Sequence, residues 1–194
     1  MCENNSFLVA KESRHELPYA QRLDFHIEST ACQARAATLA GVFNRALDVA
    51  LALAGEEEKK IEVIDAAVYR LLDPTSPGSF RYLAVERMLP EEAYTKFNSN
   101  NGFVNEHTSD ASDLAQASSH FSYDYTFAQE LVCDLQGTPT HQGITVTDPQ
   151  LHSVSGTTYG RADRGIKGIQ DFFKTHRCNA ICDRLRLPQP NLPS

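Results

Sequence analysis

The sequence predicts an α+β protein of two lobes, and three observations lead to that prediction. Residues 29–54 are rich in alanine, and apolar side chains recur there at steps of three and four, which predicts a long amphipathic helix. Residues 61–72 and 80–88 are expected to form two strands of an antiparallel hairpin. The second half is rich in loops around a short apolar run at 131–133, which is typical of a buried strand.

Local signals bound the elements of the first half. An apolar run over residues 7–11 predicts a short strand. Ser29 is the expected cap of the long helix, and Gly55 is expected to end it. The charged residues 56–60 predict a solvated loop, and the Pro-, Ser- and Gly-rich residues 73–79 predict the turn of the hairpin.

The second half carries weaker signals, and no internal repeat relates it to the first. We expect an ordered, asparagine-rich loop at 90–102, a flexible segment or short helix at 105–118, a polar turn-rich stretch at 138–147, helices at 166–173 and 179–185, and an extended tail at 188–194.

The composition is that of an ordinary globular protein. The chain has 194 residues, of which 41% are hydrophobic and 22% charged, so it can bury a core without disulfides. The 18 Lys and Arg residues stand against 25 Asp and Glu residues, which gives a net charge of −7. No basic stripe is present, so a nucleic-acid partner is not expected.

Targeting and membrane segments are not expected either. The first residues lack the apolar core of a signal peptide, and the longest apolar stretch, 46–54, is too short to span a bilayer. The five cysteines are odd in number and scattered, which suits a reducing compartment better than a disulfide framework. We therefore expect an intracellular, cytoplasmic protein with no membrane partner.

The segment from His176 to Cys182 has metal-ligand spacing. Cys178 and Cys182 are four residues apart, so on a helix both sulfur atoms would project from one face, with His176 just before them. Zinc prefers such ligands, and a structural zinc site closes as a tetrahedron of four. The alternative is two buried helical cysteines beside a surface histidine. The spacing leaves a fourth ligand open among the other histidines, which are His15, His26, His107, His120, His141 and His152.

Two aspartates stand at the starts of loops. Asp134 directly follows the predicted buried strand, a position where α/β proteins place catalytic groups. Together with Gln136 and Asp148 it offers the hard oxygen ligands that suit magnesium. In the alternative interpretation Asp134 caps a turn and Asp148 supports a turn at Pro149, and these residues alone favour that alternative.

Two further features could hold an anion. The glycine-rich segment from Gly160 to Gly168 opens a predicted helix, where backbone N–H groups could bind a phosphate. Its spacing matches neither a dinucleotide fingerprint nor a Walker A loop, so a plain helix-start loop is the favoured interpretation. Lys11 ends the first strand and could pair with phosphates, although most strand-end lysines are merely solvated.

Taken together and in order, these motifs resemble one family, the alpha-kinases, which are atypical serine/threonine protein kinases. The resemblance runs along nearly the whole chain. Its blocks are Val9-Ala10-Lys11, Val85-Glu86, Lys96-Phe97-Asn98-Ser99-Asn100-Asn101-Gly102, His120-Phe121-Ser122-Tyr123-Asp124-Tyr125-Thr126, Leu131-Val132-Cys133-Asp134-Leu135-Gln136-Gly137, Thr147-Asp148-Pro149-Gln150-Leu151-His152, Gly160 to Gly168, and Thr175-His176-Arg177-Cys178-Asn179-Ala180-Ile181-Cys182.

The resemblance implies an ATP site. By this resemblance, Lys11 holds the phosphates, while Glu86 and the backbone as far as Leu89 form the hinge to adenine. Lys96 and Asn100 lie near the nucleotide and its metal. These five positions are expected to bind ATP and its metal.

The resemblance also implies the residues of the transfer step. Asp134 would orient or deprotonate the substrate hydroxyl, and Gln136 and Asp148 would hold magnesium. The Gly160–Gly168 segment would be the family's glycine-rich loop, which is associated with the peptide substrate. Phosphoryl transfer depends on positioning and charge neutralisation, which fits these residue types.

The resemblance completes the predicted zinc site with a fourth ligand. His120 joins His176, Cys178 and Cys182, so the C-terminal lobe is expected to be stabilised by zinc. Four protein ligands leave no open coordination position, so this zinc is expected to be structural.

Four departures from the family pattern accompany the resemblance. Only ten residues precede Lys11, so we expect an incomplete N-terminal lobe that lacks the first strand pair and the phosphate-covering loop. The 138–147 stretch is longer than expected, which bears on how Asp134 and Asp148 are placed. Asp163 stands where the family often has asparagine. The acidic partner of Lys11 is not assigned, and Glu28 is a candidate by position alone.

The sequence thus predicts a two-lobed, protein-kinase-like fold of the alpha-kinase type. Its lobes are expected at 1–89 and 90–187, with a tail at 188–194. The predicted activity is transfer of the γ-phosphate of ATP to serine or threonine of a protein, with Mg²⁺ and a structural Zn²⁺. The alternative is a catalytically inactive relative that serves as a zinc-stabilised protein-binding module.

Overall fold

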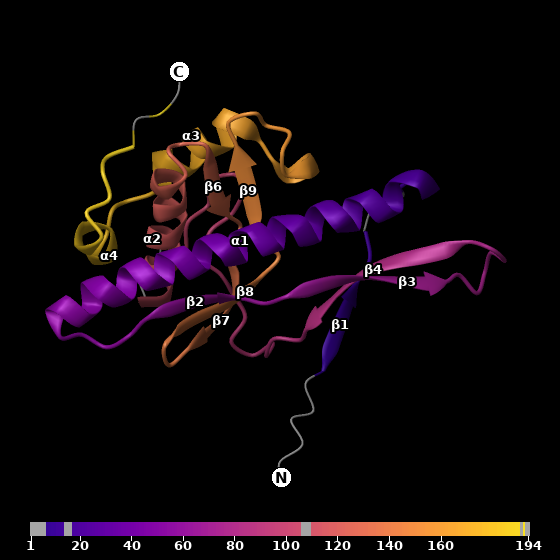
Figure 1. Cartoon of the computed structure of the whole chain (residues 1–194), viewed down its shortest axis with the longest axis horizontal. Helices are drawn as coiled ribbons and strands as arrows, with labels where there is room; N and C mark the ends of the chain where they lie inside the picture. Colours follow the sequence, from indigo (N-terminus) through magenta and orange to yellow (C-terminus); the bar gives the residue numbers. More distant parts are fainter. Residues whose placement is uncertain (1–6, 14–16, 106–109, 191, 193–194) are drawn as a thin grey trace, which may run out of the picture.

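The computed structural model describes residues 7–13, 17–105, 110–190 and 192 (Figure 1), and it contains both helices and strands, which confirms the α+β class. In chain order the elements are β1 (Leu8–Lys11), α1 (Tyr19–Ala54), β2 (Lys60–Val63), β3 (Ala66–Leu72), β4 (Phe80–Arg87), β5 (Thr95–Lys96), α2 (Asp110–Tyr125), β6 (Glu130–Cys133), β7 (Gln136–Thr140), β8 (Gly143–Thr147), β9 (Gln150–Ser153), the 3₁₀ turn η1 (Gly160–Ala162), α3 (Gly165–Thr175) and α4 (Ala180–Arg184).

The long helix α1 organises the core. It runs across the width of the molecule (Figure 1) and contacts strands of all three sheets that the described residues form. Its buried face includes the predicted apolar positions Leu39, Phe43, Leu47 and Leu51. Gly55 ends the helix as predicted, because its left-handed backbone (φ 70°) lets the N–H groups of residues 55 and 56 bond back to the last turn.

The predicted start of this helix is wrong by ten residues. Ser29 lies inside α1, which begins at Tyr19 directly after Pro18. Among the described residues no side chain caps the first turn, but His26 is buried and the Tyr19 hydroxyl accepts a hydrogen bond from the Phe80 N–H of β4 at 3.2 Å. Tertiary packing therefore extends the helix beyond its sequence signal.

The length and composition of α1 would also allow it to cross a membrane. By that measure alone it qualifies, and 33% of its most apolar window is buried. Core helices of water-soluble proteins share these properties, and nine residues of α1 are buried in this fold. The absence of a membrane partner stays a prediction.

The first sheet has the order β1-β4-β3 and is antiparallel throughout. It confirms the hairpin around the turn at 73–79, where the Asp73 carboxylate accepts a hydrogen bond from the Thr75 N–H. The predicted single strand 61–72 is wrong, because it divides into β2 and β3, which belong to different sheets. Ile64 is buried and continues the ladder of β2, and the exposed Asp65 then lets the chain cross to the other sheet.

The second sheet has the order β2-β8-β7-β5, with β2 parallel to β8. The stretch 138–147, expected to be polar and turn-rich, is mostly the antiparallel hairpin β7–β8, in which Ile144 and Val146 are buried. The apolar run at 131–133 is confirmed as the buried strand β6, which pairs with β9. The domain boundary at residue 89 stays a prediction, and β2 shares its sheet with strands from the second half.

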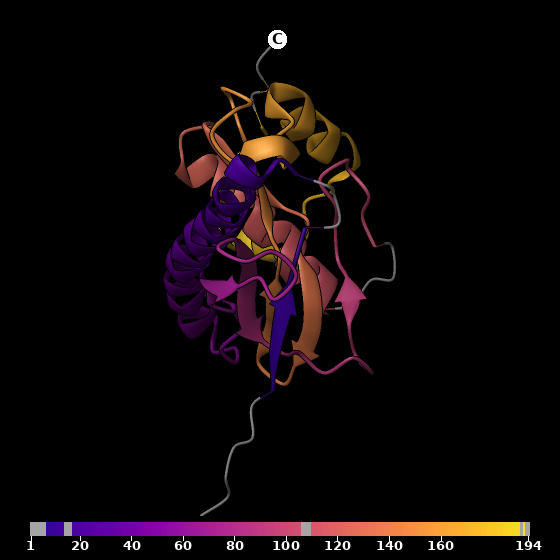
Figure 2. The same cartoon turned by 90° about the vertical axis from the view of Figure 1, so that its right-hand side faces the viewer.

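The segment 105–118 is expected to be flexible or a short helix, but most of it belongs to a longer helix. α2 extends from Asp110 to Tyr125, and residues 106–109 lie outside the described part of the chain. Its small residues, among them Ala115, Ala117 and Ser119, are buried and allow close approach to α1, β6 and β8. The predicted helices at the C-terminal end are confirmed as α3 and α4, and α3 covers the end of the molecule nearest the C-terminus (Figure 2).

Candidate functional site

Lys11 lies at the centre of a charged cluster between the two larger sheets. Its ammonium forms an ion pair with Glu86 of β4 and contacts Asp148 Oδ2 at 2.6 Å. It also donates to the Thr147 hydroxyl at 3.0 Å. Lys11 keeps 29% of its side chain exposed, so a ligand can reach it. The lysine predicted to hold phosphates therefore already faces the aspartate predicted to hold magnesium.

Glu86 is buried and supplies the acidic partner of Lys11 that the sequence did not assign. Thr147 Oγ1 donates to its Oε1 at 2.6 Å, and Gln33 Nε2 of α1 donates to its Oε2 at 3.1 Å. A carboxylate buried to this degree needs such partners, because an unpaired buried charge is costly. The candidate Glu28 lies elsewhere, with its carboxylate beside Gly160.

Gln33 and Thr147 were not predicted as site residues. Gln33 also donates to the Ile64 carbonyl at 2.6 Å, so it ties α1 to the strand ends that meet at this cluster. No local pattern marks either residue, since each becomes significant only through contacts across 31 to 136 positions of the chain. The hinge role of Glu86 and of Leu89, which is buried just beyond β4, stays a prediction.

Asp134 and Asp148 share an unusual backbone conformation. Their φ angles are 56° and 49°, in the left-handed region that non-glycine residues rarely occupy. Such conformations cost about 1–3 kcal/mol and cluster at functional sites. Asp134 follows β6 directly, and Pro149 alone separates Asp148 from β9, so the β6–β9 ladder places both aspartates at the same end.

The hairpin β7–β8 keeps these two aspartates together despite its length. Gln136 pairs with Thr147 at its base, so the extra residues extend away from the aspartates. Gly137 is required within it, because a Cβ atom there would lie 2.0 Å from the Thr145 carbonyl oxygen. Gln136 and Asp148 therefore flank one point of the sheet, where their oxygen atoms could serve as the hard ligands that magnesium takes.

Lys96 lies beside Asp134. Its ammonium is 2.6 Å from Asp134 Oδ1, and the Asp134 side chain is 16% exposed. Asn98 anchors this loop from a fully buried position, accepting from the Leu135 N–H at 2.9 Å and donating to Ser119 Oγ at 3.0 Å. The loop that carries Lys96 and Asn100 is thereby fixed to the residue that follows Asp134.

Tyr94 lies within the electrostatic influence of the carboxylates of the site. Burial first, and then the carboxylates of Asp148, Glu86 and Asp134, raise the pKa of the Tyr94 phenol to about 12. The ammonium groups of Lys11 and Lys96 offset part of the charge of these three carboxylates. Tyr94, between β4 and β5, was not singled out from the sequence.

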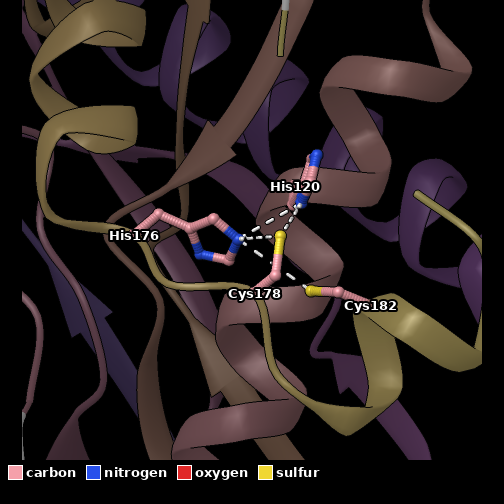
Figure 3. A group of neighbouring side chains, drawn as sticks. All are labelled: His120, His176, Cys178 and Cys182. Atoms are coloured by element: carbon pink, nitrogen blue, oxygen red, sulfur yellow. Dashed lines mark hydrogen bonds between the residues drawn. The ribbon is translucent and has the colours of Figure 1, made fainter. Parts of the chain in front are cut away.

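A second cluster joins His120, His176, Cys178 and Cys182 (Figure 3). The four candidate ligand atoms lie within 4.8 Å of one another. His176 Nε2 is 3.2 Å from His120 Nδ1, 3.8 Å from Cys178 Sγ and 3.9 Å from Cys182 Sγ. Ligand atoms around a tetrahedral zinc stand about 3.3–3.8 Å apart, given its bond lengths. The donor set and its spacing therefore fit zinc.

The two histidines of this cluster present the correct nitrogen atoms for a metal. His120 Nε2 lies 3.0 Å from the Pro188 carbonyl, and His176 Nδ1 lies 3.2 Å from Gln116 Oε1. If each of these nitrogens carries the proton and donates, the other nitrogen of each ring is left free as a ligand. Burial, and then His120, lower the pKa of His176 to about 4, so the ring is neutral.

The two cysteines do not share one helix, although the sequence predicted that they would. α4 begins at Ala180, so Cys178 precedes the helix and only Cys182 lies on it. Asn179 caps the helix, accepting from the N–H groups of Ile181 and Cys182, and donates to the Asp113 carbonyl of α2 at 2.8 Å. Burial raises the pKa of the Cys182 thiol to about 12, so a thiolate there requires a neighbouring cation.

The glycine-rich segment forms η1 and the start of α3. Asp163 is buried inside it and accepts from the Ser153 N–H and the Gly165 N–H, both at 2.9 Å, and from Ser153 Oγ at 2.5 Å. Burial alone would raise its pKa, but these bonds and one from the Tyr159 N–H hold the pKa below its ordinary value. Asp163 therefore fixes this loop to the end of β9.

Comparison with known proteins identifies relatives of this chain in sequence and in fold. The family model described as "Alpha-kinase family" matches residues 1–182. Myosin heavy chain kinase B of Dictyostelium discoideum is 37% identical over 137 residues, which is 69% of this chain and 17% of that protein. Eukaryotic elongation factor 2 kinase of Caenorhabditis elegans is 38% identical over 130 residues, which is 66% of this chain and 15% of that protein.

Solved structures of the alpha-kinase domain of myosin heavy chain kinase A share the fold. The complex of that domain with AMP has a TM-score of 0.72 and 27% identity, and it covers 93% of this chain and 65% of that chain. The complex with AMP-PNP has a TM-score of 0.71 and 29% identity, covering 88% of this chain and 59% of that chain. The chain thus spans less than two thirds of each of these proteins.

Proposed function

The chain belongs to the alpha-kinase family, and from that premise we propose that it is a protein kinase domain that transfers the γ-phosphate of ATP to serine or threonine. The observation that carries the proposal is the meeting of Lys11, Asp148 and the Lys96–Asp134 pair at one end of the sheets. Solved domains of a relative bind AMP and AMP-PNP, which supports ATP as the nucleotide here.

Each side chain of the cluster has a proposed task. Lys11, held by Glu86, exchanges its contact with Asp148 for the phosphates of ATP. Asp148 and Gln136 then hold Mg²⁺, which neutralises phosphate charge when bound. Asp134 accepts a hydrogen bond from the substrate hydroxyl and takes up its proton.

Positioning accounts for most of the proposed catalysis. Lys96 balances the charge of Asp134 while the hydroxyl approaches, and the left-handed backbone of Asp134 and Asp148 aims both carboxylates from one end of the sheets. Phosphoryl transfer requires little beyond such positioning and charge stabilisation. The glycine-rich loop lies at the start of α3 and is proposed to hold the peptide.

We also propose a structural Zn²⁺ held by His120, His176, Cys178 and Cys182. When bound, the ion supplies a closed cross-link between α2 and the segment that leads into α4. None of the described cysteines forms a disulfide, which supports the proposal of an intracellular, cytoplasmic location.

One observation favours the alternative of an inactive, zinc-stabilised binding module. Lys11 contacts Asp148 directly at 2.6 Å, so the lysine and the metal-binding carboxylate satisfy each other without a nucleotide. A module of this kind would bind a protein partner but would not transfer phosphate.

One experiment decides between the two functions. The chain is incubated with ATP that carries a radiolabelled γ-phosphate, with Mg²⁺ and a library of Ser- and Thr-containing peptides. Label on Ser or Thr, together with a Mg²⁺-dependent rise in melting temperature on addition of ATP, is expected for the kinase. No label and no thermal shift would contradict the proposal and favour the binding module.

A further inference from the structure

His152 is a buried polar residue that no proposed role uses. It lies on β9, four residues after Asp148, and its side chain is completely buried. In the β6–β9 ladder it faces Leu131, two residues before Cys133 and three before Asp134. Buried imidazoles are normally satisfied by hydrogen bonds, so its partners reveal what it holds together.

The contacts of this ring define where its proton lies. The Arg164 N–H donates to Nδ1 at 3.1 Å, so Nδ1 is an acceptor. The proton of the neutral ring therefore resides on Nε2, which donates to the Asn100 carbonyl at 2.9 Å. Cys133 Sγ packs 3.4 Å from the same nitrogen.

The two partners belong to the two loops that flank the transfer site. Asn100 lies in the loop of Lys96, which pairs with Asp134. Arg164 lies in the glycine-rich segment, and its guanidinium donates to the same Asn100 carbonyl at 2.9 Å and to Asp171 at 2.9 Å. One imidazole thus joins the loop on the nucleotide side to the loop on the peptide side.

The surrounding backbone leaves room for this ring and no more. A Cβ atom on Gly168 would lie 2.4 Å from His152 Cδ2. At the end of the Lys96 loop, a Cβ atom on Gly102 would lie 2.5 Å from the Asp171 carbonyl oxygen. The His152 ring and the end of the Lys96 loop are therefore both packed closely against α3.

We propose that His152 is a positioning residue that fixes the Lys96–Asn100 loop and the glycine-rich loop relative to each other, so that nucleotide and peptide hydroxyl meet at Asp134. The proposal rests on the kinase function proposed above. It differs from a simple filling role, because its two hydrogen bonds serve different substrates. A residue that only fills space would affect both loops together.

Two substitutions separate the two hydrogen bonds. His152→Gln keeps an N–H near the position of Nε2, so it retains the donor to Asn100 and loses the acceptor for Arg164. His152→Asn keeps an oxygen near the position of Nδ1, so it retains the acceptor and loses the donor. The same two substitutions at His141, an exposed residue in the β7–β8 turn, serve as matched controls.

The first readout is hydrogen exchange of backbone amides, which needs no catalytic activity. We expect His152→Gln to speed exchange in residues 160–168 only and His152→Asn to speed it in residues 96–102 only, each about 3- to 10-fold for the loss of one hydrogen bond. The second readout is kinetic. His152→Gln should raise KM for peptide, and His152→Asn should raise KM for ATP, by a similar factor.

These readouts keep the two proposals distinguishable. Equal changes in both loops for both variants, or no change in either loop, would overturn the positioning role. Separate loop effects in a chain that transfers no phosphate would instead contradict the kinase function. Should either variant fail to fold, nitrogen NMR of the wild-type ring decides, since a proton on Nδ1 would overturn the proposal and a proton on Nε2 would support it.

Discussion

The two polar clusters of this molecule are built in opposite ways. In the charged cluster, Lys11 and Lys96 keep 29% and 42% of their side chains exposed, and both aspartates adopt left-handed backbone conformations. In the His–Cys cluster, three of the four residues are buried, and the histidine nitrogens that face away from the centre lie near the Pro188 carbonyl and the Gln116 amide oxygen. The first cluster is open to new partners, whereas the second is closed around its own centre.

We interpret the charged cluster as the site of phosphate transfer and the His–Cys cluster as a support for the fold. Lys11 pairs with Asp148 and Lys96 pairs with Asp134 at partly exposed positions, and we propose that a nucleotide and a peptide replace these two contacts. The His–Cys groups converge on a single point, where a cation would satisfy all four at once. Changes in the closed cluster should therefore affect folding, and changes in the open cluster should affect phosphate transfer.

Loss of a metal ligand should have the largest effect. Cys182→Ser removes a thiolate from the closed cluster, and structural zinc contributes about 10–16 kcal/mol in finger peptides, comparable with the about 5–15 kcal/mol stability of a whole domain. We expect the variant to lose zinc by metal analysis and to lose cooperative melting of its C-terminal part by circular dichroism.

The matched control is Cys32→Ser, which makes the same change at a buried thiol outside the cluster. It should keep a full equivalent of zinc. The assignment would be contradicted if purified wild-type protein contained no zinc or if Cys182→Ser protein still bound it. Either result would also remove the contrast between the clusters.

The His–Cys cluster is where prediction from sequence worked best. His176, Cys178 and Cys182 are close in the chain, so spacing alone indicated a shared site, and the resemblance added His120 from 56 residues away. The structure brings all four together. The predicted helix that carries both cysteines was wrong, because Asn179 caps a helix that begins between them. A capping residue changes the direction of the chain without changing the sequence spacing of the cysteines.

Substitution of Lys11 should have the next largest effect, and on activity rather than on metal content. Lys11→Met removes the proposed phosphate ligand, and we expect kcat/KM for ATP to fall about 100-fold, or about 2.7 kcal/mol. Lys59→Ala is the control, because Lys59 pairs with the exposed Asp110 away from the charged cluster, and it should leave the kinetics unchanged.

Lys11→Met also leaves the Glu86 carboxylate buried without its cation. The double variant with Glu86→Gln should recover the melting temperature but not the use of ATP. Recovery of both would show that Lys11 supports the fold only, and full activity in Lys11→Met would exclude its role with phosphate.

The charged cluster was harder to predict than the His–Cys cluster. Asp134 could be identified because it follows a predicted buried strand, whereas Asp148 follows a stretch predicted to be polar and turn-rich, and its role came from the resemblance. That stretch is mostly the β7–β8 hairpin. Its alternation of Thr, Ile and Val is short and lies beside Gly, Pro and His, which obscures the pattern of a strand. The Lys11–Glu86 pair joins two strands of one sheet that are far apart in the chain, and Gln33 reaches Glu86 from α1. A single sequence holds no local signal for such contacts.

A smaller effect is expected from Asp163, which fixes the glycine-rich loop. The pKa of its carboxyl lies below the ordinary value of 3.8 in the folded protein, so the carboxylate stabilises the fold above that pH and loses this contribution as pH falls through the lowered pKa. Asp163→Asn loses the acceptor on one oxygen and should cost about 1–2 kcal/mol at neutral pH.

Urea unfolding of both proteins at neutral pH and again below pH 3.8 measures this prediction. The difference in stability should shrink as pH falls through the lowered pKa, measured at pH values where both proteins are first shown to be folded with equal zinc content. A difference that stays constant with pH would show that the charge of Asp163 does not hold the loop.

Asp134 offers the most direct test of the contrast between the two clusters. Wild-type protein and Asp134→Asn are compared in a single-turnover transfer of radiolabelled γ-phosphate, with zinc content, melting temperature and MgATP affinity measured on the same samples. We predict that Asp134→Asn loses transfer by at least about 1000-fold, or about 4 kcal/mol, while the other three quantities stay at wild-type values. Transfer at the wild-type rate in the folded, zinc-loaded variant would contradict the account.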